Sequence, residues 1–548
     1  MTGKKKSVHV KPDYDAVVIG AGFSGLYMLH SLRENGYSTK VFEKADDVGG
    51  TWYWNRYPGA RCDSDSVYYN YTFSEELFKG WTWSSRYPEQ AEILTYLNYV
   101  ADTLHLRDGI QFNTTINHAN YNEENNLWRI YTEDGDSVTA TYFITAVGCL
   151  SASNVPNFKG LDSFKGNWYH TGQWPHEGVD FTGQKVGVIG TGSSGVQSIP
   201  VIAKEADHLT VFQRTPQYCF PARNHPYDPE FVKETKEKFS QLKTELRESH
   251  SGQIIKSRKP SALDDTSEDR NKAYEDRWQQ GGYLFIYDDL LINEESNETA
   301  AEFIRSKIAE TVKNPETAQK LMPSYHWGTK RQILDTDYYE TYNRDNVSLI
   351  DVRSNPIEEI TPNGIKTTAG EEEFDAIVFA TGFDGMTGPL FRMDIHGKDG
   401  IALKDKWEEG SQTRTYLGLS TNGFPNMFMI TGPESPSVLS NMPISIEQHV
   451  EWITDCINYM QKSDIDLIEA NEEAEKEWSK HCRDIAEETL YTKTDSWYMG
   501  ANIKGKARGF LIYLGGVGTY RKICKEVAEN SYEGFDLISS TKTHSYTK

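Results

Sequence analysis

The chain has 548 residues, enough for about two to four domains of ordinary size. Its 57 Lys and Arg residues against 80 Asp and Glu residues give a formal net charge of −23, which argues against nucleic acid or an anionic membrane as a partner. The six cysteines are scattered without a CxxC pair, and no apolar run is long enough to cross a membrane, so we expect a cytoplasmic protein with no disulfide framework and no metal ion. A monomer is also expected, although no sequence feature determines the oligomeric state.

The first expected elements form a strand, a glycine turn, a helix and a second strand. Tyr14–Ile19 reads as a buried parallel strand, and the turn at 20–25, GAGFSG, matches GxGxxG. Apolar residues then recur at helical spacing, and the strand Thr39–Phe42 ends on Glu43. An acid at this point is typical of a Rossmann fold, in which it binds a ribose hydroxyl.

A second copy of this pattern follows from residue 184. The strand Lys185–Ile189 leads into GTGSSG at 190–195, and the strand Leu209–Phe212 is followed by Arg214. A guanidinium in place of the acid suits a 2′-phosphate, which a carboxylate would repel. We therefore expect two dinucleotides with different roles: FAD at the first copy and NADPH at the second.

The remaining chain predicts how the two copies are connected. Tyr142–Gly148 and Ala376–Gly382 are apolar strands ending in a glycine turn, as expected where the chain leaves a Rossmann domain. Residues 227–321 are rich in charged residues, and amphipathic stretches such as Phe231–Leu246 predict a helical insertion in the second domain. Ser445 and Gln448 form a capping-box pattern that predicts the start of a later helix.

The predicted fold class is therefore α/β, with two Rossmann-like dinucleotide-binding domains, for FAD and NADPH, and a helical insertion in the NADPH domain. The FAD domain is expected to comprise residues 10–148 and 385–540, and the NADPH domain residues 149–226 and 322–384. The insertion spans 227–321, and residues 541–548 form a frayed tail.

Two further segments carry a family resemblance. Residues 49–63, GGTWYWNRYPGARCD, combine glycines, aromatics and charges, as the wall of a flavin site would. Residues 164–175, FKGNWYHTGQWP, match FxGxxxHxxxW[P/D] at every fixed position. Together with GTGSSG, KR at 330–331, ATGFD at 380–384 and SWYMGANIKGK at 496–506, they make the chain resemble type I Baeyer–Villiger monooxygenases from about Tyr14 to Tyr532, in the phenylacetone and cyclohexanone monooxygenase branch.

The resemblance implies a reaction on ketones. NADPH would reduce FAD, O2 would be captured as a flavin C4a-peroxide, and this anion would attack a ketone to form a tetrahedral (Criegee) adduct that yields an ester or lactone. The family's catalytic arginine matches Arg331, whose permanent charge would stabilise both anions, and its partner acid matches Asp63. His170 is fixed in the signature, and we expect it to be a hydrogen-bonded strut rather than a catalyst.

The other site residues follow from the turns, the aromatic cluster and the family motifs. Arg214 and Lys330 are expected to share the 2′-phosphate beside Thr215, and Trp497 to close over the nicotinamide nucleotide. The cofactor-binding candidates are Gly20, Gly22, Phe23, Ser24, Gly25, Glu43, Thr51, Trp52, Tyr53, Trp54, Arg61, Asp63, Tyr69, Ile116, Thr191, Gly192, Ser193, Ser194, Gly195, Gln197, Arg214, Thr215, Lys330, Arg331, Met442 and Trp497. The ketone-pocket candidates are Ser437, Val438 and Leu439.

Two other functions stay open at this point. An N- or S-oxygenating flavin monooxygenase uses a neutral hydroperoxide as the electrophile and needs no anion-stabilising arginine, so Arg331 and the Trp174-Pro175 ending argue against it. A flavoprotein that only binds or senses redox state would not need two complete nucleotide turns and a charge pair beside the flavin.

Overall fold

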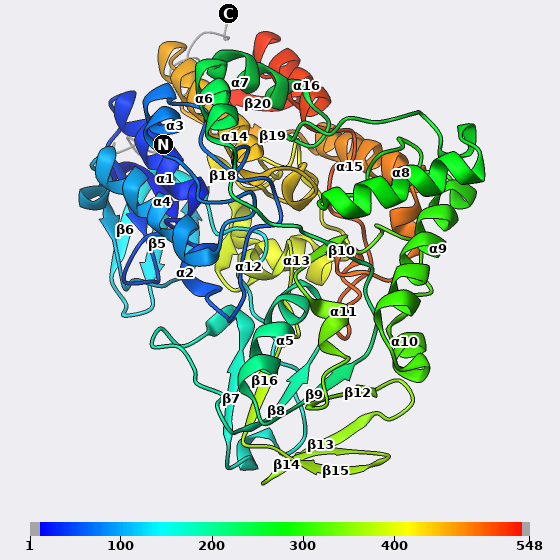
Figure 1. Ribbon diagram of the computed structural model, residues 1–548. Coiled ribbons are helices and arrows are strands. Elements are labelled where there is room, and N and C mark those ends of the chain that lie inside the picture. Colours follow the sequence, from blue (N-terminus) through cyan, green and yellow to red (C-terminus); the bar gives the residue numbers. More distant parts are fainter. Residues whose placement is uncertain (1–10, 540–548) are drawn as a thin grey trace, which may run out of the picture.

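Two β-sheets, one for each glycine turn, organise residues 11–539, which the computed structural model describes (Figure 1). The expected tail at 541–548 lies outside these residues. The first sheet has the strand order β17-β4-β5-β6-β1-β2-β3, with β18 also paired to β6. Its strands are β1 (Tyr14–Ile19), β2 (Thr39–Phe42), β3 (Ile110–Gln111), β4 (Ile116–Asn122), β5 (Leu127–Thr132), β6 (Ser137–Thr145), β17 (Asp394–His396) and β18 (Met427–Met429). The first sheet is mixed, since β5 pairs antiparallel with β4 and β6 and the other pairs are parallel.

The second sheet, at the bottom of Figure 1, has the strand order β12-β9-β8-β16-β7 and is parallel throughout. Its strands are β7 (Asn167–His170), β8 (Lys185–Ile189), β9 (His208–Gln213), β12 (Val347–Asp351) and β16 (Ala376–Phe379). A two-Rossmann α/β fold was the sequence prediction, and the sheets confirm it, since β1 and β8 each lie inside a sheet and each precedes a glycine turn.

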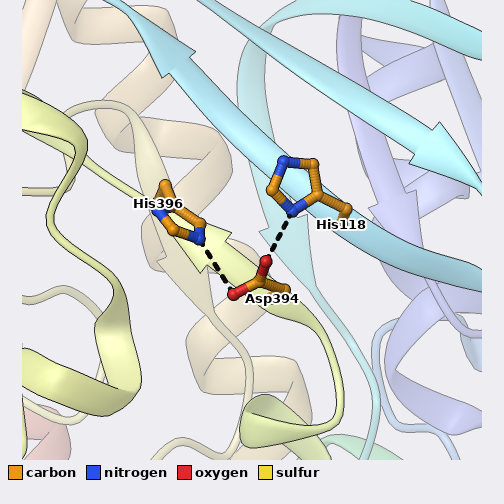
Figure 2. A group of neighbouring side chains, drawn as sticks. All are labelled: His118, Asp394 and His396. Atoms are coloured by element: carbon orange, nitrogen blue, oxygen red, sulfur yellow. Dashed lines mark hydrogen bonds and ion pairs between the residues drawn. The ribbon is translucent and has the colours of Figure 1, made fainter.

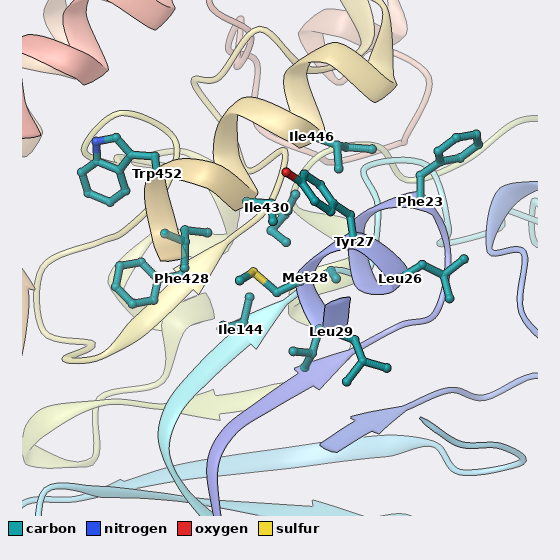
Figure 3. Close-up of a cluster of buried hydrophobic side chains, with 14 of the residues drawn as sticks. Phe23, Leu26, Tyr27, Met28, Leu29, Ile144, Phe428, Ile430, Ile446 and Trp452 are labelled. Atoms are coloured by element: carbon teal, nitrogen blue, oxygen red, sulfur yellow. The ribbon is translucent and has the colours of Figure 1, made fainter. Parts of the chain in front are cut away.

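Late segments of the chain complete the first sheet. Helix α1 (Phe23–Glu34) follows the first glycine turn and packs against helix α14 (Met442–Lys462). Figure 3 shows side chains of α1, among them Tyr27 and Met28, against Ile430 and Ile446. Strand β18 pairs with the carboxyl end of β6, so the first core contains residues separated by nearly 300 positions.

The helices of 227–321, the insertion expected in the second domain, pack into two different cores. Helix α7 (Phe239–Glu248) packs against α16 (Val517–Glu529), in a cluster with Phe78 and Ile444 of the first domain. Helices α8 (Ser267–Gln280), α9 (Glu294–Thr311) and α10 (Pro315–Leu321) contribute to the core of the second sheet. The amphipathic stretch Phe231–Leu246 belongs to two helices, since α6 (Pro229–Glu237) ends before α7 begins.

Helix α14 begins at Met442, three residues before the predicted start at Ser445. Its N-cap is Asn441, and Pro443 occupies the first turn, where a missing N–H costs nothing. The other helices are α2 (Thr51–Trp54), α3 (Glu75–Gly80), α4 (Gln90–Thr103), α5 (Ser193–Glu205), α11 (Tyr338–Thr341), α12 (Gly388–Phe391), α13 (Leu403–Lys406) and α15 (Glu472–Glu487). The other strands are β10 (Cys219–Pro221), β11 (Ile333–Asp335), β13 (Ile357–Thr361), β14 (Gly364–Thr367), β15 (Gly370–Glu373), β19 (Leu467–Ala470) and β20 (Phe535–Ile538).

Between residues 11 and 539, no helix has both the length and the apolar character needed to cross a bilayer. All six cysteines are buried free thiols.

Candidate functional site

The first glycine turn packs tightly against neighbouring backbone and leaves the N-terminus of helix α1 uncapped. Gly20 has φ +104°, and a Cβ there would lie 2.6 Å from the Ala146 carbonyl oxygen. Gly22, the N-cap of α1, lies against Gly50, and among the described residues no side chain caps this helix. The N–H groups of its first turn, Phe23, Ser24 and Gly25, therefore remain available to an anionic group such as a pyrophosphate.

Glu43 lies behind this turn as the sequence predicted for a ribose-binding acid. The residue is 5% exposed, and its two carboxylate oxygens accept the backbone N–H groups of Ala21 at 2.6 Å and Ala45 at 2.8 Å. Burial raises the pKa of Glu43, although the backbone donors partly offset this. The open helix terminus, the glycines and this oriented acid fit the adenosine half of a dinucleotide.

The aromatic segment after Gly50 forms one wall beside this turn. Trp52 and Tyr69 are both buried, and the Trp52 indole donates to the Tyr69 hydroxyl at 3.1 Å. Tyr53 donates to Asp46 at 2.6 Å, while Thr51 and Trp54 stay more exposed on α2. Ile116, also predicted at the cofactor, lies at the start of β4 in the hydrophobic core with Phe42.

The second glycine turn repeats the geometry of the first. Gly190 has φ +110°, and a Cβ there would lie 2.4 Å from the Ala380 carbonyl oxygen. Gly192 caps α5 without a side-chain bond, and a Cβ on it would meet nothing within 4 Å, so the space above the turn is open. Thr191 donates to the Thr215 carbonyl at 3.0 Å. Ser193, Ser194 and Gly195 form the first turn of the helix.

A cluster of three cations lies beyond this turn. Lys330 is close enough to Arg214 and Arg353 that both lower its pKa, and together with burial, the largest cause, they bring it to about 8. Arg353 also donates to the Thr215 hydroxyl at 3.1 Å. Among residues 11–539, Arg214 makes no ion pair, so the cluster presents unneutralised positive charge.

Arg353 was not singled out from the sequence. It lies just beyond β12, and the parallel register pairs Asp351 of that strand with Gln213 of β9. Residues that follow neighbouring parallel strands lie at the same edge of a sheet. Recognition of the strand at 347–351 could therefore have placed Arg353 near Arg214.

Asp63 and Arg331, the predicted catalytic pair, meet across 268 residues of sequence. The guanidinium binds both carboxylate oxygens, Nε to Oδ2 at 2.7 Å and Nη2 to Oδ1 at 2.9 Å. Burial alone would lower the pKa of Arg331, but Asp63 with Tyr283 and Tyr498 outweighs it and raises the pKa. Arg331 therefore stays a cation at any working pH.

The loop that carries Lys330 and Arg331 presents one cation to each side. Lys330 faces the cation cluster and donates to the Asp495 carbonyl at 2.6 Å, whereas Arg331 faces Asp63. Thr329 anchors the loop through the Thr494 hydroxyl at 2.8 Å. Two consecutive residues of this loop thus contact opposite sides of it.

The predicted ketone-pocket residues lie against Arg331. They form the short 3₁₀ turn Ser437–Leu439, and the Val438 carbonyl accepts Nη1 of Arg331 at 3.1 Å. Met442 begins α14 and packs, partly buried, in the same cluster as Val438 and Leu439. A cavity of about 880 Å³ lies nearby and is lined in part by Tyr283, whose pKa is raised by burial and by Asp63, but Arg331 and Ser437–Leu439 do not line it.

Trp497 belongs to the segment 494–506 that docks on the linker after β16. Its ring lies 3.5 Å from where a Cβ on Gly385 would be. Lys506 binds Asp384 at 2.5 Å and the Gly385 carbonyl at 2.7 Å. This segment therefore contacts both the linker and the Lys330 loop.

The two domains also touch directly through Gln197 of α5. Its side chain accepts the Tyr57 hydroxyl at 2.8 Å and donates to the Arg61 carbonyl at 3.2 Å. Gly59 approaches so closely that a Cβ there would lie 2.4 Å from the Gln197 carbonyl oxygen. Arg61 itself pairs with Glu89 at 3.0 Å.

His170 is buried at the end of β7, where it accepts the Gly172 N–H at 3.0 Å. Burial lowers its pKa to about 4, so the ring is neutral at physiological pH. It lies edge-on to Phe383 of the linker after β16, at 6.0 Å between ring centres. A neutral, packed ring is consistent with a strut, which remains a prediction.

Comparisons with known proteins place this geometry in a family. The flavin-binding monooxygenase-like family profile matches residues 14–258. The chain is 45% identical to a Baeyer–Villiger monooxygenase from Pseudooceanicola batsensis, over 95% of this chain and 96% of the relative. It is 45% identical to a cyclohexanone 1,2-monooxygenase from an Acinetobacter species, over 96% and 97%. It is also 44% identical to phenazine N-monooxygenase PhzNO1 from Lysobacter antibioticus, over 96% and 98%.

Solved structures give the same result. An oxidised steroid monooxygenase bound to NADP superposes with a TM-score of 0.91 at 47% identity, covering 96% of this chain and 99% of that one. OTEMO in complex with FAD and NADP superposes with a TM-score of 0.93 at 40% identity, covering 96% and 100%. Because identity this high extends over nearly the whole length of both kinds of relative, the chain belongs to the flavin-dependent Baeyer–Villiger monooxygenases of the flavin-binding monooxygenase-like family.

Proposed function

We propose that the protein oxidises a ketone to an ester or lactone at the face of Arg331, with O2, FAD and NADPH. The observation that carries the proposal is the two-point ion pair between Asp63 and Arg331, which lies between the two dinucleotide folds. Bound FAD, once reduced by NADPH, supplies an activated form of oxygen. The protein's part is to bind both nucleotides and to stabilise negative charge on the reacting oxygens.

Arg331 has donors left for that task. A guanidinium carries five N–H groups, and Asp63 and Val438 engage three of them. The Tyr498 hydroxyl also lies within hydrogen-bonding reach of the guanidinium. An N–H group that these partners do not engage can bind the anion formed when oxygen adds to the ketone carbonyl, as an oxyanion hole does. Asp63 binds Nε and Nη2 of the guanidinium, and the Val438 carbonyl accepts from Nη1. The guanidinium is therefore held in place, and little reorganisation is needed when the anion forms.

Arg214, Lys330 and Arg353 are assigned to the 2′-phosphate of NADPH. The three cations repel one another, since Arg214 and Arg353 lower the pKa of Lys330 more than Asp495 raises it, and a phosphate would remove that repulsion. Glu43 is assigned to the ribose of FAD. Trp497 is assigned to cover the nicotinamide nucleotide, because its segment contacts both the Lys330 loop and the linker.

N-oxygenation is the second candidate function. The phenazine N-monooxygenase is as similar to this chain as the ketone monooxygenases are, so full-length similarity alone does not choose the acceptor atom. The Asp63–Arg331 pair favours ketones, since an oxyanion needs a fixed cation and attack on a nitrogen lone pair by a neutral oxidant does not.

The protein is further proposed to act as a cytoplasmic monomer. Six buried free thiols, which need no oxidising compartment, support the location. Of the large apolar side chains that are exposed, Trp168, Ile292 and Ile401 lie in separate segments, although Phe231 and Ile255 line one cavity, and this scatter supports the monomer.

Product analysis tests the proposal. The FAD-loaded enzyme, NADPH and air are incubated with linear, cyclic and aryl ketones, and in parallel with a thioether and a phenazine. We expect ester or lactone matched to NADPH consumption. Products from the thioether and phenazine alone would instead support heteroatom oxygenation.

Arg331→Ala is the matched variant for that assay. It is expected to lower ester formation by about 10²–10³-fold, because one oxyanion contact is worth that much. Arg305→Ala, which removes an arginine paired with Glu298 on helix α9, away from the site, is the control and should keep most activity. Undiminished ester formation by Arg331→Ala would refute the assigned role.

A further inference from the structure

A cluster of two histidines and one aspartate lies at the far edge of the first sheet (Figure 2). His118 is on β4, and Asp394 and His396 are on β17, the edge strand. The ligand atoms of the three side chains all lie within 4.8 Å of one another. Four strand steps separate β17 from β1, roughly 20 Å, so the cluster is separate from the nucleotide turns.

Sheet register brings the three side chains together. The parallel pairing sets Asp394 opposite His118, and His396 lies two residues further along the same face. The alternate residues, Ala119 and Ile395, point into the hydrophobic core and are almost fully buried. The three polar groups are thus fixed on the outer face by the packing of their neighbours.

Both ring nitrogens of His396 lie next to acceptor oxygens, which a neutral imidazole cannot satisfy alone. Its Nδ1 lies 2.9 Å from the Gly400 carbonyl oxygen, and its Nε2 lies 2.9 Å from Oδ1 of Asp394. A neutral imidazole has only one N–H, yet both ring nitrogens face acceptors. Either a second proton or a cation must lie between Nε2 and the carboxylate.

The surroundings resemble the outer shell of a metal ligand. A carbonyl that accepts the second ring N–H of a histidine fixes the tautomer and aims the other nitrogen, as Gly400 does here. The loop that presents Gly400 is itself held, since Gly397 donates to the Ile401 carbonyl at 2.9 Å and Asp399 to Glu123 at 2.8 Å. Asp394 is 63% exposed on its side chain, which leaves room for water ligands.

We propose that His118, Asp394 and His396 bind a divalent transition-metal ion of the Zn²⁺ class, which fastens edge strand β17 to β4. Two imidazoles and one carboxylate are ligands that Zn²⁺ accepts, with water in the remaining position, whereas Mg²⁺ and Ca²⁺ prefer oxygen ligands only. The ion would join segments 276 residues apart in the sequence. The scattered cysteines predicted no metal ion. The two histidines of this cluster are far apart in the sequence and are brought together only by the register of β4 and β17.

The test is metal titration of the tag-free, FAD-loaded enzyme after treatment with a chelator. Calorimetry with Zn²⁺ should give one equivalent bound, and the affinity should fall at least about tenfold in His118→Ala, His396→Ala and Asp394→Asn. His208→Ala is the matched control, because His208 is also a half-buried strand histidine with a side-chain partner, Ser348, and it should bind Zn²⁺ as the wild type does. Ketone oxidation should be unchanged in all four variants.

A second measurement needs no variant. Diethyl pyrocarbonate is added to the wild type with and without Zn²⁺, and acylated histidines are located by mass spectrometry. Zn²⁺ should protect His118 and His396 but leave exposed His225 reactive. A wild type that takes up no Zn²⁺, uptake that survives all three substitutions, or histidines that stay equally reactive would each overturn the proposal.

Discussion

Gly20 and Gly190 begin the two dinucleotide folds with nearly the same geometry. Their φ angles are +104° and +110°, and each lies against a carbonyl of the strand by which the chain leaves that domain, Ala146 in one fold and Ala380 in the other. The difference comes one strand later. Glu43 is buried and bonded to two backbone N–H groups, whereas Arg214 is exposed beside two further cations.

The same backbone design thus selects two different ligands. The acid of the first fold, Glu43, is oriented before any ligand binds, since its carboxylate oxygens already accept the backbone N–H groups of Ala21 and Ala45. The cations of the second fold are held close together without compensation, so the energy of their repulsion is released only when an anion binds. The first fold is pre-organised by hydrogen bonds, and the second is selective through charge.

Reversing the charge of the second fold should have the largest effect. In Arg214→Glu the phosphate loses a charge-assisted hydrogen bond worth about 1.5–3 kcal/mol and meets a repelling carboxylate, so the NADP⁺ affinity should fall by about 100-fold or more. The NAD⁺ affinity should change by less than about threefold, because NAD⁺ has no 2′-phosphate. Titration of both nucleotides measures this, and equal weakening would show that the phosphate is bound elsewhere.

Altering the acid of the first fold should have a smaller effect, and on stability. Glu43→Gln replaces one acceptor oxygen by an NH2 group that faces a backbone N–H, either that of Ala21 or that of Ala45. A buried unpaired donor costs about 1–3 kcal/mol, so the variant should unfold at a lower temperature and release FAD faster. Thermal unfolding followed by FAD fluorescence measures both, and Glu89→Gln at the exposed pair with Arg61 is the control. A variant as stable as the wild type would mean that the acid is not pre-organised.

The smallest effect is a pH dependence confined to the second fold. The pKa of Lys330 is lowered to about 8, so in the free enzyme the side chain loses its proton as the pH rises past that value. The dissociation constant of NADP⁺ should therefore rise by up to about tenfold between pH 7 and pH 9, while that of NAD⁺ stays level. Calorimetry across this range measures it. Lys330→Arg should abolish the trend, and a persisting trend in that variant would assign it to another group.

Local patterns predicted the two folds well. Four strands begin and end within one residue of their predicted limits: β1, β2, β8 and β9. Their limits could be predicted because runs of apolar residues and glycine turns are local features of the sequence. The prediction failed where packing decides. Helix α14 begins at Met442, with Pro443 in its first turn, rather than at the predicted Ser445. The amphipathic stretch Phe231–Leu246, for which no helix limits were predicted, is divided into two helices at Lys238.

The site shows the same limit more strongly. Asp63 and Arg331 are 268 residues apart, and no periodicity in the sequence relates them, so their pairing could be expected only from the family resemblance. Arg353 escaped notice because it becomes relevant only when β12 lies beside β9. The cluster at His118 likewise depends on the register between strands from opposite ends of the first domain.

The late completion of the first sheet affects how the chain is made. Strand β6 ends at Thr145, but its partner β18 ends at Met429, 284 residues later. At about 5–20 residues per second, a ribosome needs roughly 15–60 s to synthesise that interval. During this time the apolar face of α1 lacks Ile430 and Ile446, whereas the second sheet already has all its strands by Phe379. The domain that begins first in the chain must therefore be the last to finish folding, and its nascent form is the stage most exposed to chaperones and to aggregation.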